Sequence, residues 1–410
     1  MRAHIAVVAL AAFVTACASS DDTAGLPTVP TLDEQGTAGF VAVTAGGDHT
    51  CALNTTGRAY CWGSDGYAQL GHPPSARCDT TALGACSLSA EPVATSLVFR
   101  AISAGAEHTC AIASDSTAYC WGSNATGALG IPAPMAQGPE SVTGGLRFTS
   151  ISAGVTHTCG VATDSVAYCW GANDRGQLGT GDSLSRSAPT AVVTSERFVQ
   201  LSAGQGRTCG RTAARAVLCW GAVWLYRSDG LEYTRAQLVP QAVPGAPPLD
   251  GVSVGSFTTC GVGGATVYCW EANPHGEFGN GTTEGSTTPL PVGGGMQFSS
   301  VAAGVIQTCG VTTDGDAYCW GNDSFGQLGV SPGAVASRCA SQDLPCSLVP
   351  VRVIGWRQFT SISTGFGNHV CAVTTDANIY CWGLGQSGQL GYGNFIGATS
   401  QPLKVAIALP

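Results

Sequence analysis

The amino-acid sequence predicts an all-β fold, a seven-bladed β-propeller, from three observations. Seven pairs of cysteines recur along the chain, and the first members of successive pairs are 49 to 62 residues apart. A Trp follows the second cysteine of every pair. Between these markers lie short apolar runs, rich in Val, Ile, Tyr and Trp and bounded by Gly, Asp, Asn, Ser or Pro, which predict strands. Because a unit of about 50 residues cannot bury its apolar face alone, we expect the seven units to stack around an axis and close a ring.

The composition excludes several other classes of protein. Hydrophobic residues make up 44% of the 410 residues, which is enough for a sizeable core and excludes a disordered chain. The 17 basic and 26 acidic residues give a net charge of −9 without any run of Lys or Arg, so we expect no nucleic-acid partner. Nineteen cysteines indicate an oxidising compartment. Since this number is odd, at least one cysteine must have a use other than an internal disulfide.

The start of the chain indicates export. Arg2 precedes an apolar stretch that is too short to span a bilayer, and this stretch ends in Val-Thr-Ala directly before Cys17. The pattern resembles the lipobox of bacterial lipoproteins, in which Cys17 would become the lipidated first residue. The alternative is an ordinary signal peptide cut nearby, at Ala16 or Ala18. The lipobox is favoured because Cys17 is then the odd cysteine, and an even number remains behind it.

The chain is accordingly divided into three parts. We expect residues 1–16 to be a lipoprotein signal peptide and residues 17–38, which are rich in Pro, Gly and Thr, to be a flexible tether. Residues 39–410 form the expected propeller. Such a protein would be exported and anchored through Cys17 in the cell envelope, at the outer membrane or the cell surface.

Each cysteine pair is expected to bracket a β-hairpin. Between Cys159 and Cys169 the polar residues lie at the midpoint, so the two cysteines stand directly opposite, with Cβ atoms about 4.5–5.5 Å apart, close to disulfide geometry. In the fifth unit the cysteines are one residue closer, and a tighter turn at Gly263-Gly264-Ala265 keeps them opposed. The expected hairpin disulfides are Cys51–Cys61, Cys110–Cys120, Cys159–Cys169, Cys209–Cys219, Cys260–Cys269, Cys309–Cys319 and Cys371–Cys381.

Units one and six are longer than the others, and each carries an additional cysteine pair in its insert. We expect Cys78–Cys86 and Cys339–Cys346 to staple these two loops. Zinc is the competing use for so many cysteines. Its usual C-x₂-C spacing is absent, however, and two opposed cysteines of one hairpin cannot supply four tetrahedral ligands. The sequence therefore favours nine disulfides and no metal.

The repeated motifs carry a family resemblance. The best-matching units contain Ala-Gly-x-x-His-Thr-Cys, then Tyr-Cys-Trp-Gly, and later Gly-Gln-Leu-Gly, as at 176–179, 326–329 and 388–391. These motifs resemble the repeats of the regulator of chromosome condensation (RCC1-like) family, in its cysteine-rich bacterial version, and they recur throughout residues 39–410. The resemblance implies the seven-bladed propeller of that family. We expect the segment 402–409 to close the ring beside the first strand, 40–44.

Most conspicuous side chains are explained by the repeat. Four histidines share one position, two residues before the first cysteine of a pair, and three other units have Arg, Thr or Gln there. Because equivalent positions are spread around a ring, we expect hydrogen bonds from these side chains to the backbone rather than a metal site. We expect the seven repeated Trp residues in the core between blades. The histidines are His49, His108, His157 and His369.

Departures from the repeat are more informative about function, because the fold does not require them. Unit four lacks Gly-Gln-Leu-Gly and has instead a segment rich in Trp, Tyr and Arg, the residues that dominate binding hot spots. We therefore expect part of a binding surface at Trp224, Tyr226, Arg227, Tyr233 and Arg235, against the alternative of a repacked loop without a partner. The inserts at 72–91 and 330–350 are the next candidates.

The sequence favours a non-catalytic binding scaffold. It contains no nucleophile elbow, no His-Glu-x-x-His and no phosphate-binding loop, so we expect neither an enzyme nor a cofactor. The expected partner is an unidentified protein or extracellular polymer, bound by a monomer. Three alternatives stay open: an inhibitor of an extracellular or periplasmic enzyme, similar to a secreted propeller that inhibits β-lactamase; a guanine-nucleotide exchange role by family analogy; and a polysaccharide-active enzyme, since glycosidase carboxylates have no fixed spacing.

Overall fold

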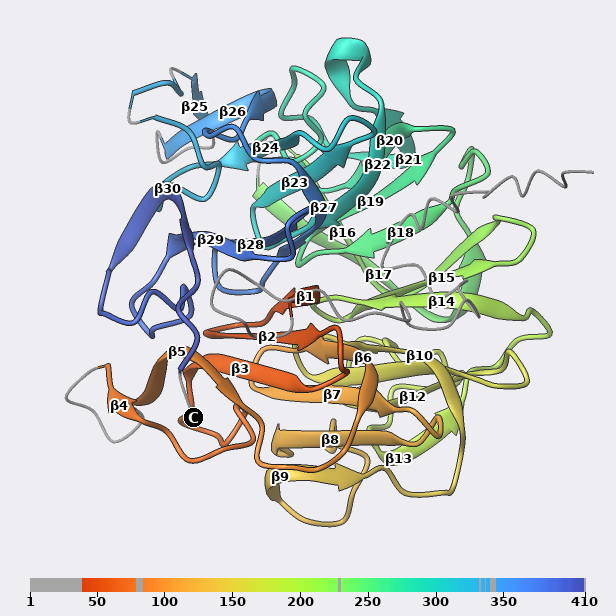
Figure 1. The fold of residues 1–410 in the computed structure, drawn as a ribbon. Helices are drawn as coiled ribbons and strands as arrows, with labels where there is room; N and C mark the ends of the chain where they lie inside the picture. Colours follow the sequence, from red (N-terminus) through yellow and green to blue (C-terminus); the bar gives the residue numbers. More distant parts are fainter. Residues whose placement is uncertain are drawn as a thin grey trace, which may run out of the picture.

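The computed structural model describes residues 39–78, 84–227, 230–331, 333–335, 337–339 and 344–408, and the side chains of 226–235 lie outside this description. Its strands form seven antiparallel sheets that follow one another around a ring in chain order (Figure 1). In every sheet four main strands pair consecutively in chain order, and in blades one and six one short additional strand pairs with the outer edge of the fourth main strand. The predicted seven-bladed β-propeller is therefore confirmed.

The first three blades show the common plan. Blade one contains β1 (Phe40–Ala45), β2 (His49–Asn54), β3 (Ala59–Ser64) and β5 (Ala85–Pro92), with the short β4 (Ala76–Arg77) added at the edge of β5. Blade two contains β6 (Phe99–Ala104), β7 (His108–Ala113), β8 (Ala118–Ser123) and β9 (Met135–Ser141). Blade three contains β10 (Phe148–Ala153), β11 (His157–Ala162), β12 (Ala167–Gly171) and β13 (Arg186–Ala191).

The other four blades repeat this plan with local changes. Blade four contains β14 (Phe198–Ala203), β15 (Arg207–Thr212), β16 (Val217–Arg227) and β17 (Gly230–Ala242). Blade five contains β18 (Gly251–Val254), β19 (Thr258–Gly263), β20 (Thr266–Glu271) and β21 (Ser286–Pro291), and a 3-10 turn, η1 (Gly293–Gly295), follows it. Blade six contains β22 (Phe298–Ala303), β23 (Gln307–Thr312), β24 (Ala317–Asn322), β25 (Ser337–Cys339) and β26 (Leu344–Arg352). Blade seven contains β27 (Phe359–Thr364), β28 (His369–Thr374), β29 (Ile379–Leu384) and β30 (Ala398–Lys404).

The hairpin register places the cysteines as expected. Cys159 stands opposite Cys169, and the Cα atoms of this disulfide are 4.1 Å apart. In blade five the pairing continues to Gly263 opposite Thr266, so a two-residue turn absorbs the missing residue and keeps its cysteines opposed. All seven hairpin pairs and both loop pairs form disulfides.

The seven repeated Trp side chains are buried between blades, as predicted. Each indole packs into a core with apolar residues of its own and the preceding blade, and several contact the Phe that begins the first strand, as Phe148 does with Trp170 at a ring distance of 5.8 Å. The indole N–H also bonds across the blade interface. Trp121, for example, donates to the Gln69 carbonyl of blade one at 2.9 Å.

Two strands from opposite ends of the chain close the ring. β1 lies against β27 and β28, and the Phe40 N–H donates to the Ala377 carbonyl of blade seven at 2.9 Å (Figure 1). The expected pairing of the C-terminal segment with β1 is wrong. That segment pairs with β5, where Ala90 donates to the Ala406 carbonyl and accepts from the Ala408 N–H. The physical reason is that β1 is the innermost strand of its blade, whereas β5 is the outermost main strand. The short β4 pairs with only part of the outer edge of β5, so the backbone groups of the rest of that edge are free to pair with the C-terminal segment.

Candidate functional site

The three departures from the repeat lie on one face of the ring. Because strands alternate in direction, the connections from first to second strand and from third to fourth strand lie at one end of every blade. The two inserts lie between the third and fourth strands of blades one and six, and the lengthened hairpin joins the third and fourth strands of blade four. We call this end of the ring the insert face and the opposite end the turn face.

An inner ring of equivalent residues lines the insert face. Each member precedes the second strand of its blade, and its carbonyl accepts a backbone N–H from the end of the third strand, as Asp48 accepts from Ser64 at 2.8 Å. The chemistry of these residues changes around the ring. Blades one and two carry acidic, exposed members, and blades five and six carry apolar, partly buried ones. In blade order the members are Asp48, Glu107, Thr156, Gly206, Phe257, Ile306 and Asn368.

A second set of residues surrounds this inner ring. In five blades the residue before the Gly-Gln-Leu-Gly position donates its backbone N–H to the Gln or Glu side chain two residues later, at 2.8 Å. This bond fixes the loop and leaves the preceding side chain at the surface. The set consists of Tyr67, Arg175, His275, Phe325 and Ser387. Phe325 is 37% exposed, so aromatic surface is present in blade six as well as in blade four.

The blade-four hairpin reaches over this face. Its strands have 11 and 13 residues and pair as far as Arg227 opposite Gly230. The ring of Trp224 meets Phe257 of blade five edge to face, with centroids 5.5 Å apart. The guanidinium carbon of Arg175 lies 4.9 Å from the centre of the Trp224 ring, a cation–π contact from blade three. Trp224 therefore bridges three blades.

The structure describes the side chain of only one of the five predicted binding residues of this hairpin. The structure places Trp224 on the insert face and joins it to two residues that the sequence did not single out, Phe257 and Arg175. Phe257 could have been found, because most units have a polar residue or Gly at that position. The backbone at Tyr226, Arg227, Tyr233 and Arg235 belongs to the paired hairpin strands, and their side chains lie outside the described structure. Their part in binding stays a prediction.

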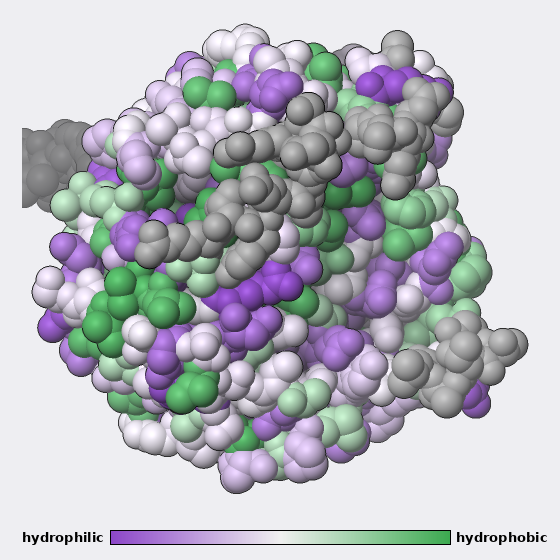
Figure 2. All heavy atoms as spheres, turned by 180° about the vertical axis from the view of Figure 1, so that it is seen from behind, coloured by the Kyte–Doolittle hydropathy of each residue, from purple (hydrophilic) through white to green (hydrophobic). Residues whose placement is uncertain are grey.

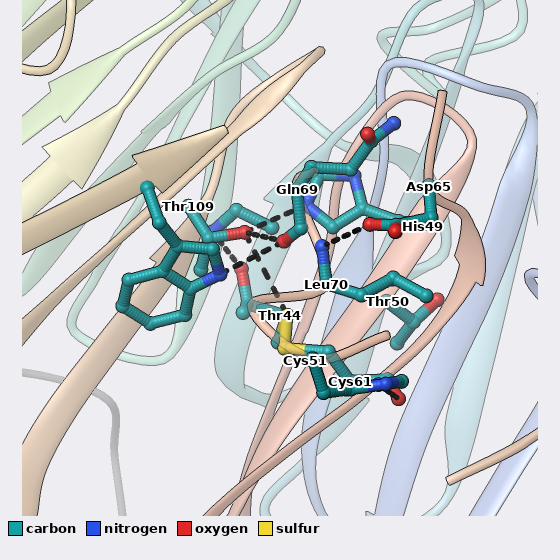
Figure 3. The surroundings of a disulfide bond; sticks show 12 residues. Thr44, His49, Thr50, Cys51, Cys61, Asp65, Gln69, Leu70 and Thr109 are labelled. Carbon is teal, nitrogen blue, oxygen red and sulfur yellow. Dashed lines mark hydrogen bonds between the residues drawn. A yellow bond between two sulfur atoms is a disulfide. The ribbon is translucent and has the colours of Figure 1, made fainter. Parts of the chain in front are cut away.

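Because blade four lacks the Gly-Gln-Leu-Gly motif, hydrogen bonds that join other neighbouring blades are missing between blades four and five in the described part of the chain. In blade one, the Gln69 carbonyl accepts from both Thr109 and Trp121 of the next blade, at 3.0 and 2.9 Å (Figure 3). Among the described residues of blade four, no carbonyl accepts hydrogen bonds from Thr259 and Trp270 in this way. The indole N–H of Trp270 consequently has no hydrogen-bond partner within the described chain, and Thr259 donates instead to the Glu271 carboxylate at 2.9 Å.

A buried ion pair lies at this interface between blades four and five. Arg207 takes the histidine position of blade four, and Glu271 takes the position of the Gly that follows Cys-Trp in every other unit. Their Nε and Oε1 atoms are 2.8 Å apart, with the side chains 6% and 2% exposed. Glu271 keeps the positive φ of the Gly that it replaces, 83°, a conformation that L-residues rarely adopt. Burial raises the pKa of Glu271, against the opposing effect of Arg207.

The ion pair is coupled to the hairpin. Arg207 also donates from Nη1 to the Gln237 side chain of β17 at 2.8 Å. The same guanidinium therefore contacts the core of blade five and the base of the surface hairpin. The sequence did not reveal Glu271. The available signal was the loss of Gly after Cys-Trp in unit five alone.

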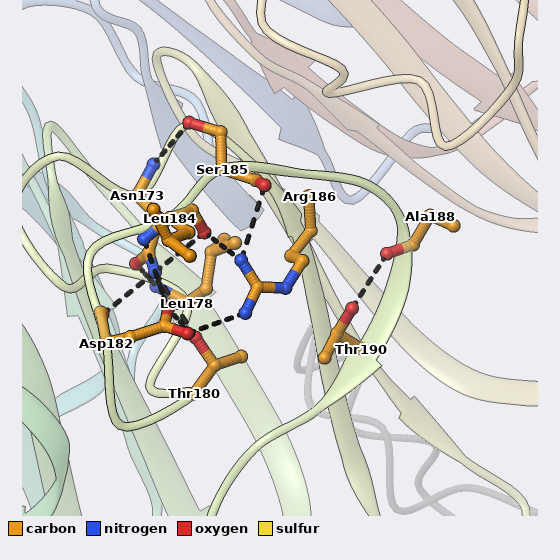
Figure 4. Close-up of polar contacts among 9 residues, drawn as sticks. All are labelled: Asn173, Leu178, Thr180, Asp182, Leu184, Ser185, Arg186, Ala188 and Thr190. Atoms are coloured by element: carbon orange, nitrogen blue, oxygen red, sulfur yellow. Dashed lines mark hydrogen bonds and ion pairs between the residues drawn. The ribbon is translucent and has the colours of Figure 1, made fainter.

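In blades two, three and five an Asn side chain fixes the connection between the third and fourth strands. In blade three the Asn173 amide donates to the carbonyls of Asp182 and Leu184 and accepts from the Leu178 N–H (Figure 4). Arg186 and Asp182 add an ion pair with a 2.6 Å contact. The hydrogen bonds from the Leu184 N–H and Arg186 lower the pKa of Asp182.

The stapled loops lack this amide. Blades one and six have Asp65 and Asp323 at the position of Asn173, and each carboxylate still accepts the N–H of the Leu in the Gly-Gln-Leu-Gly position, as Leu70 does in Figure 3. A carboxylate cannot donate to the returning strand. In these two blades a disulfide, Cys78–Cys86 or Cys339–Cys346, closes the loop instead.

The four histidines are structural, but their partner differs from the expected one. Each ring Nε2 bonds the Thr hydroxyl of the next blade rather than a backbone group, as His49 does with Thr109 at 2.8 Å (Figure 3). Burial lowers the pKa to about 3 for His49 and His157 and to about 4 for His108 and His369. The imidazoles are therefore neutral at pH 7. No group of three metal-binding side chains is found in the described ranges.

Two further findings concern the whole described chain. No helix in it has the length and apolar character needed to cross a bilayer. A shallow groove on the insert face, between blades two and three, is lined by residues such as Thr126, Ile131 and Arg186. The residues that line this groove include no carboxylate.

Comparison with known proteins identifies the repeats. A family model described as regulator of chromosome condensation (RCC1) repeat matches residues 40–69, 99–128, 148–177, 298–327 and 359–389. A second model with the same description matches 56–112, 115–161, 164–210 and 314–373. Together the matches cover more than half of the chain. They leave out 211–297, the region that contains the hairpin and Glu271.

Relatives share the repeat over part of their length. The ultraviolet-B receptor UVR8 of Arabidopsis thaliana is 31% identical over 158 residues, which are 36% of this chain and 33% of UVR8. The human E3 ubiquitin-protein ligase HERC2 is 30% identical over 131 residues, 31% of this chain and 2% of HERC2. This chain therefore corresponds to a third or less of these relatives.

Solved structures share the fold. Prp20p of Saccharomyces cerevisiae superposes with a TM-score of 0.72 and 20% identity, over 84% of this chain and 85% of Prp20p. The yeast RCC1 (Prp20) structure with Kap60 gives 0.75 and 18%, over 99% and 90%. Human WBSCR16 gives 0.71 and 18%, over 85% and 94%. From the repeat matches, the chain belongs to the family of regulator of chromosome condensation (RCC1) repeat proteins.

Proposed function

We propose that this protein is an exported lipoprotein whose propeller binds another protein, or an extracellular polymer, through the insert face. The observation that carries the proposal is the shared location of the two stapled inserts and the blade-four hairpin. A fold with seven units offers two faces for insertions, and all three lie on one. Proteins of similar fold include Prp20p, described by its binding to Gsp1p and histones, which supports a protein-binding role.

The insert face has the chemistry of a protein interface. Its aromatic side, around Trp224, Phe257 and Phe325, offers the side chains that commonly dominate binding energy. Its acidic side, at Asp48 and Glu107, would favour a partner with basic groups and speed its association. Figure 2 shows one side of the molecule, on which hydrophilic and hydrophobic residues are interspersed.

Export and anchoring rest on the sequence. Nine disulfides are compatible with an oxidising compartment, and Cys17 follows a short apolar stretch. A Cys17→Ser variant is expected to lose metabolic lipid labelling and to leave the membrane fraction. Retention of the variant in the membrane would count against the lipobox.

The binding surface is tested after the partner has been captured by crosslinking the intact lipoprotein in its envelope. The triple replacement of Trp224, Tyr226 and Arg227 by Ala is expected to weaken binding of the captured partner at least tenfold. Val193→Ala, an exposed apolar residue of the turn face, is the matched control and should leave binding unchanged. Equal affinity of the triple variant and the control would refute the role of the hairpin.

Inhibition of an extracellular enzyme is a second candidate, favoured by one observation. Trp224 contacts both Phe257 and Arg175, so this part of the surface is formed before a partner arrives, which reduces the entropy lost on binding. Stoichiometric loss of a target enzyme's activity without turnover would support inhibition. Turnover in a screen of cell-wall and plant glycans would instead indicate an enzyme.

A further inference from the structure

We propose that the turn face lies against the phospholipid bilayer, with Trp356 inserted at the level of the lipid headgroups. This contact would direct the insert face away from the membrane, toward its partner. The inference rests on the proposed lipid anchor at Cys17 and adds to it an orientation and a second point of contact.

Trp356 is the first observation. It lies in the link between β26 and β27 and is 95% exposed, more than any other large hydrophobic residue in the described chain. Gly355 before it has a φ of 113°, and a Cβ there would come within 2.8 Å of Arg357. The Arg357 guanidinium carbon lies 4.0 Å from the centre of the Tyr380 ring. The link therefore holds Arg357 against blade seven and leaves the adjacent indole in solvent.

The point where the chain enters the propeller is the second, independent observation. The Gly39 carbonyl accepts the N–H of Thr55, in the hairpin turn of blade one, at 2.8 Å, and the next residue bonds Ala377 in the hairpin turn of blade seven. On the other side of that same turn, the Gln358 carbonyl accepts the N–H of Thr375 at 3.0 Å. Gly39 and the link that bears Trp356 therefore lie on the turn face, on either side of the blade-seven turn.

These positions bring the expected tether and the indole to the same side of the molecule. A flexible chain of the length of residues 17–38 spans about 25 Å on average, so a lipid at Cys17 would hold the turn face near the bilayer. Trp prefers the interface between membrane and water, where its ring is buried and its N–H stays hydrated. One Trp binds weakly alone, but the tether raises its effective concentration at the membrane.

The charges around Trp356 do not oppose this contact. Arg352 pairs with Asp316 at 2.7 Å, and the guanidinium of Arg357, the residue after Trp356, lies over the Tyr380 ring. Asp314 and Asp376 belong to the hairpin turns of blades six and seven. Because charges of both signs are present, the contact is expected to depend on the apolar indole more than on anionic lipid.

The test uses the full lipidated chain reconstituted in vesicles of phosphatidylethanolamine and phosphatidylglycerol, with or without bromine on the acyl chains. Bromine quenches Trp fluorescence only at close range. The wild-type protein is expected to show bromine-dependent quenching, and Trp356→Ala is expected to lose it completely, because the seven repeated Trp residues are buried in the ring and the ninth, Trp224, lies on the insert face. The double variant Trp356→Ala/Leu184→Trp places an indole at an exposed position of the insert face instead, and should remain unquenched.

Several outcomes would overturn the inference. Equal quenching of Trp356→Ala and wild type, or quenching of the Leu184→Trp double variant, would show that the turn face is not the membrane side. Crosslinking from a photoreactive residue at position 356 to a protein rather than to lipid would assign the indole to another partner. Lipid labelling is measured on the same samples: labelled protein without Trp356 quenching overturns only the orientation, whereas unlabelled wild-type protein overturns the anchor and the orientation together.

Discussion

The buried ion pair between blades four and five offers a direct test of how the propeller tolerates the missing motif. Replacing Arg207 by His and Glu271 by Gly restores the residues that most other blades carry at these positions. A histidine at 207 could bond Thr259 of the next blade, as His157 bonds Thr208 at 2.8 Å. Gly at 271 would accept the positive φ of 83° without strain. The double variant is therefore expected to be about as stable as the wild type.

The single variants should behave differently. Glu271→Gly leaves Arg207 buried without its carboxylate, a change that costs about 3–5 kcal/mol in comparable buried pairs. Relief of the backbone strain offsets about 1–2 kcal/mol of this loss. We expect a net decrease of about 1–4 kcal/mol in the free energy of unfolding. Arg207→His should also destabilise, because it leaves the carboxylate of Glu271 buried without its guanidinium partner.

The measurement is a guanidinium titration followed by Trp fluorescence, without reductant so that the disulfides stay closed. The three variants and the wild type form a double-mutant cycle, from which the interaction energy of the pair is obtained. If the double variant proved no more stable than Glu271→Gly alone, the two residues would not be replacing the repeat motif as a unit, and the reasoning would be refuted.

Three further predictions concern the periodic residues. Four buried histidines have folded-state pKa values of about 3–4, below the ordinary 6.5, so the stability that they contribute is full above pH 6.5 and falls as the pH drops toward 4. Replacing His157 by Gln, the residue that blade six carries at this position, should reduce the pH slope of the unfolding free energy in this range by about 1.4 kcal/mol per pH unit. An unchanged slope would contradict the lowered pKa of His157. Replacing both Cys159 and Cys169 by Ala removes a disulfide with a sequence separation of 10. This should lower the free energy of unfolding, measured by denaturant titration, by about 3 kcal/mol. An unchanged free energy would mean that strand pairing alone fixes the hairpin. Trp121→Phe removes the hydrogen bond to the blade-one carbonyl, whereas Trp270→Phe removes none, so thermal unfolding should show the former to be more destabilising by about 1 kcal/mol; equal losses would indicate that the bond contributes little.

Much of the fold could be predicted because its markers are local. Cys159 and Cys169 are close in sequence, and the position of the turn between them fixes which residues stand opposite, so the disulfide follows from the hairpin alone. The recurrence of that hairpin with a following Trp determined the number of blades. The candidate site was predicted only in part: Trp224 was identified as a departure from the repeat, but its contacts with Phe257 and Arg175 were not.

The sequence by itself determined the seven blades, their disulfides and the units that depart from the repeat, because each of these depends on residues within one unit. The tertiary structure alone decided how the units meet. It gave the histidines a Thr hydroxyl from the next blade, paired Arg207 with Glu271, and joined the C-terminal segment to β5. It also placed all three insertions on one face. These contacts depend on how one blade stacks on the next, and the spacing of residues within a repeat carries no information about that geometry.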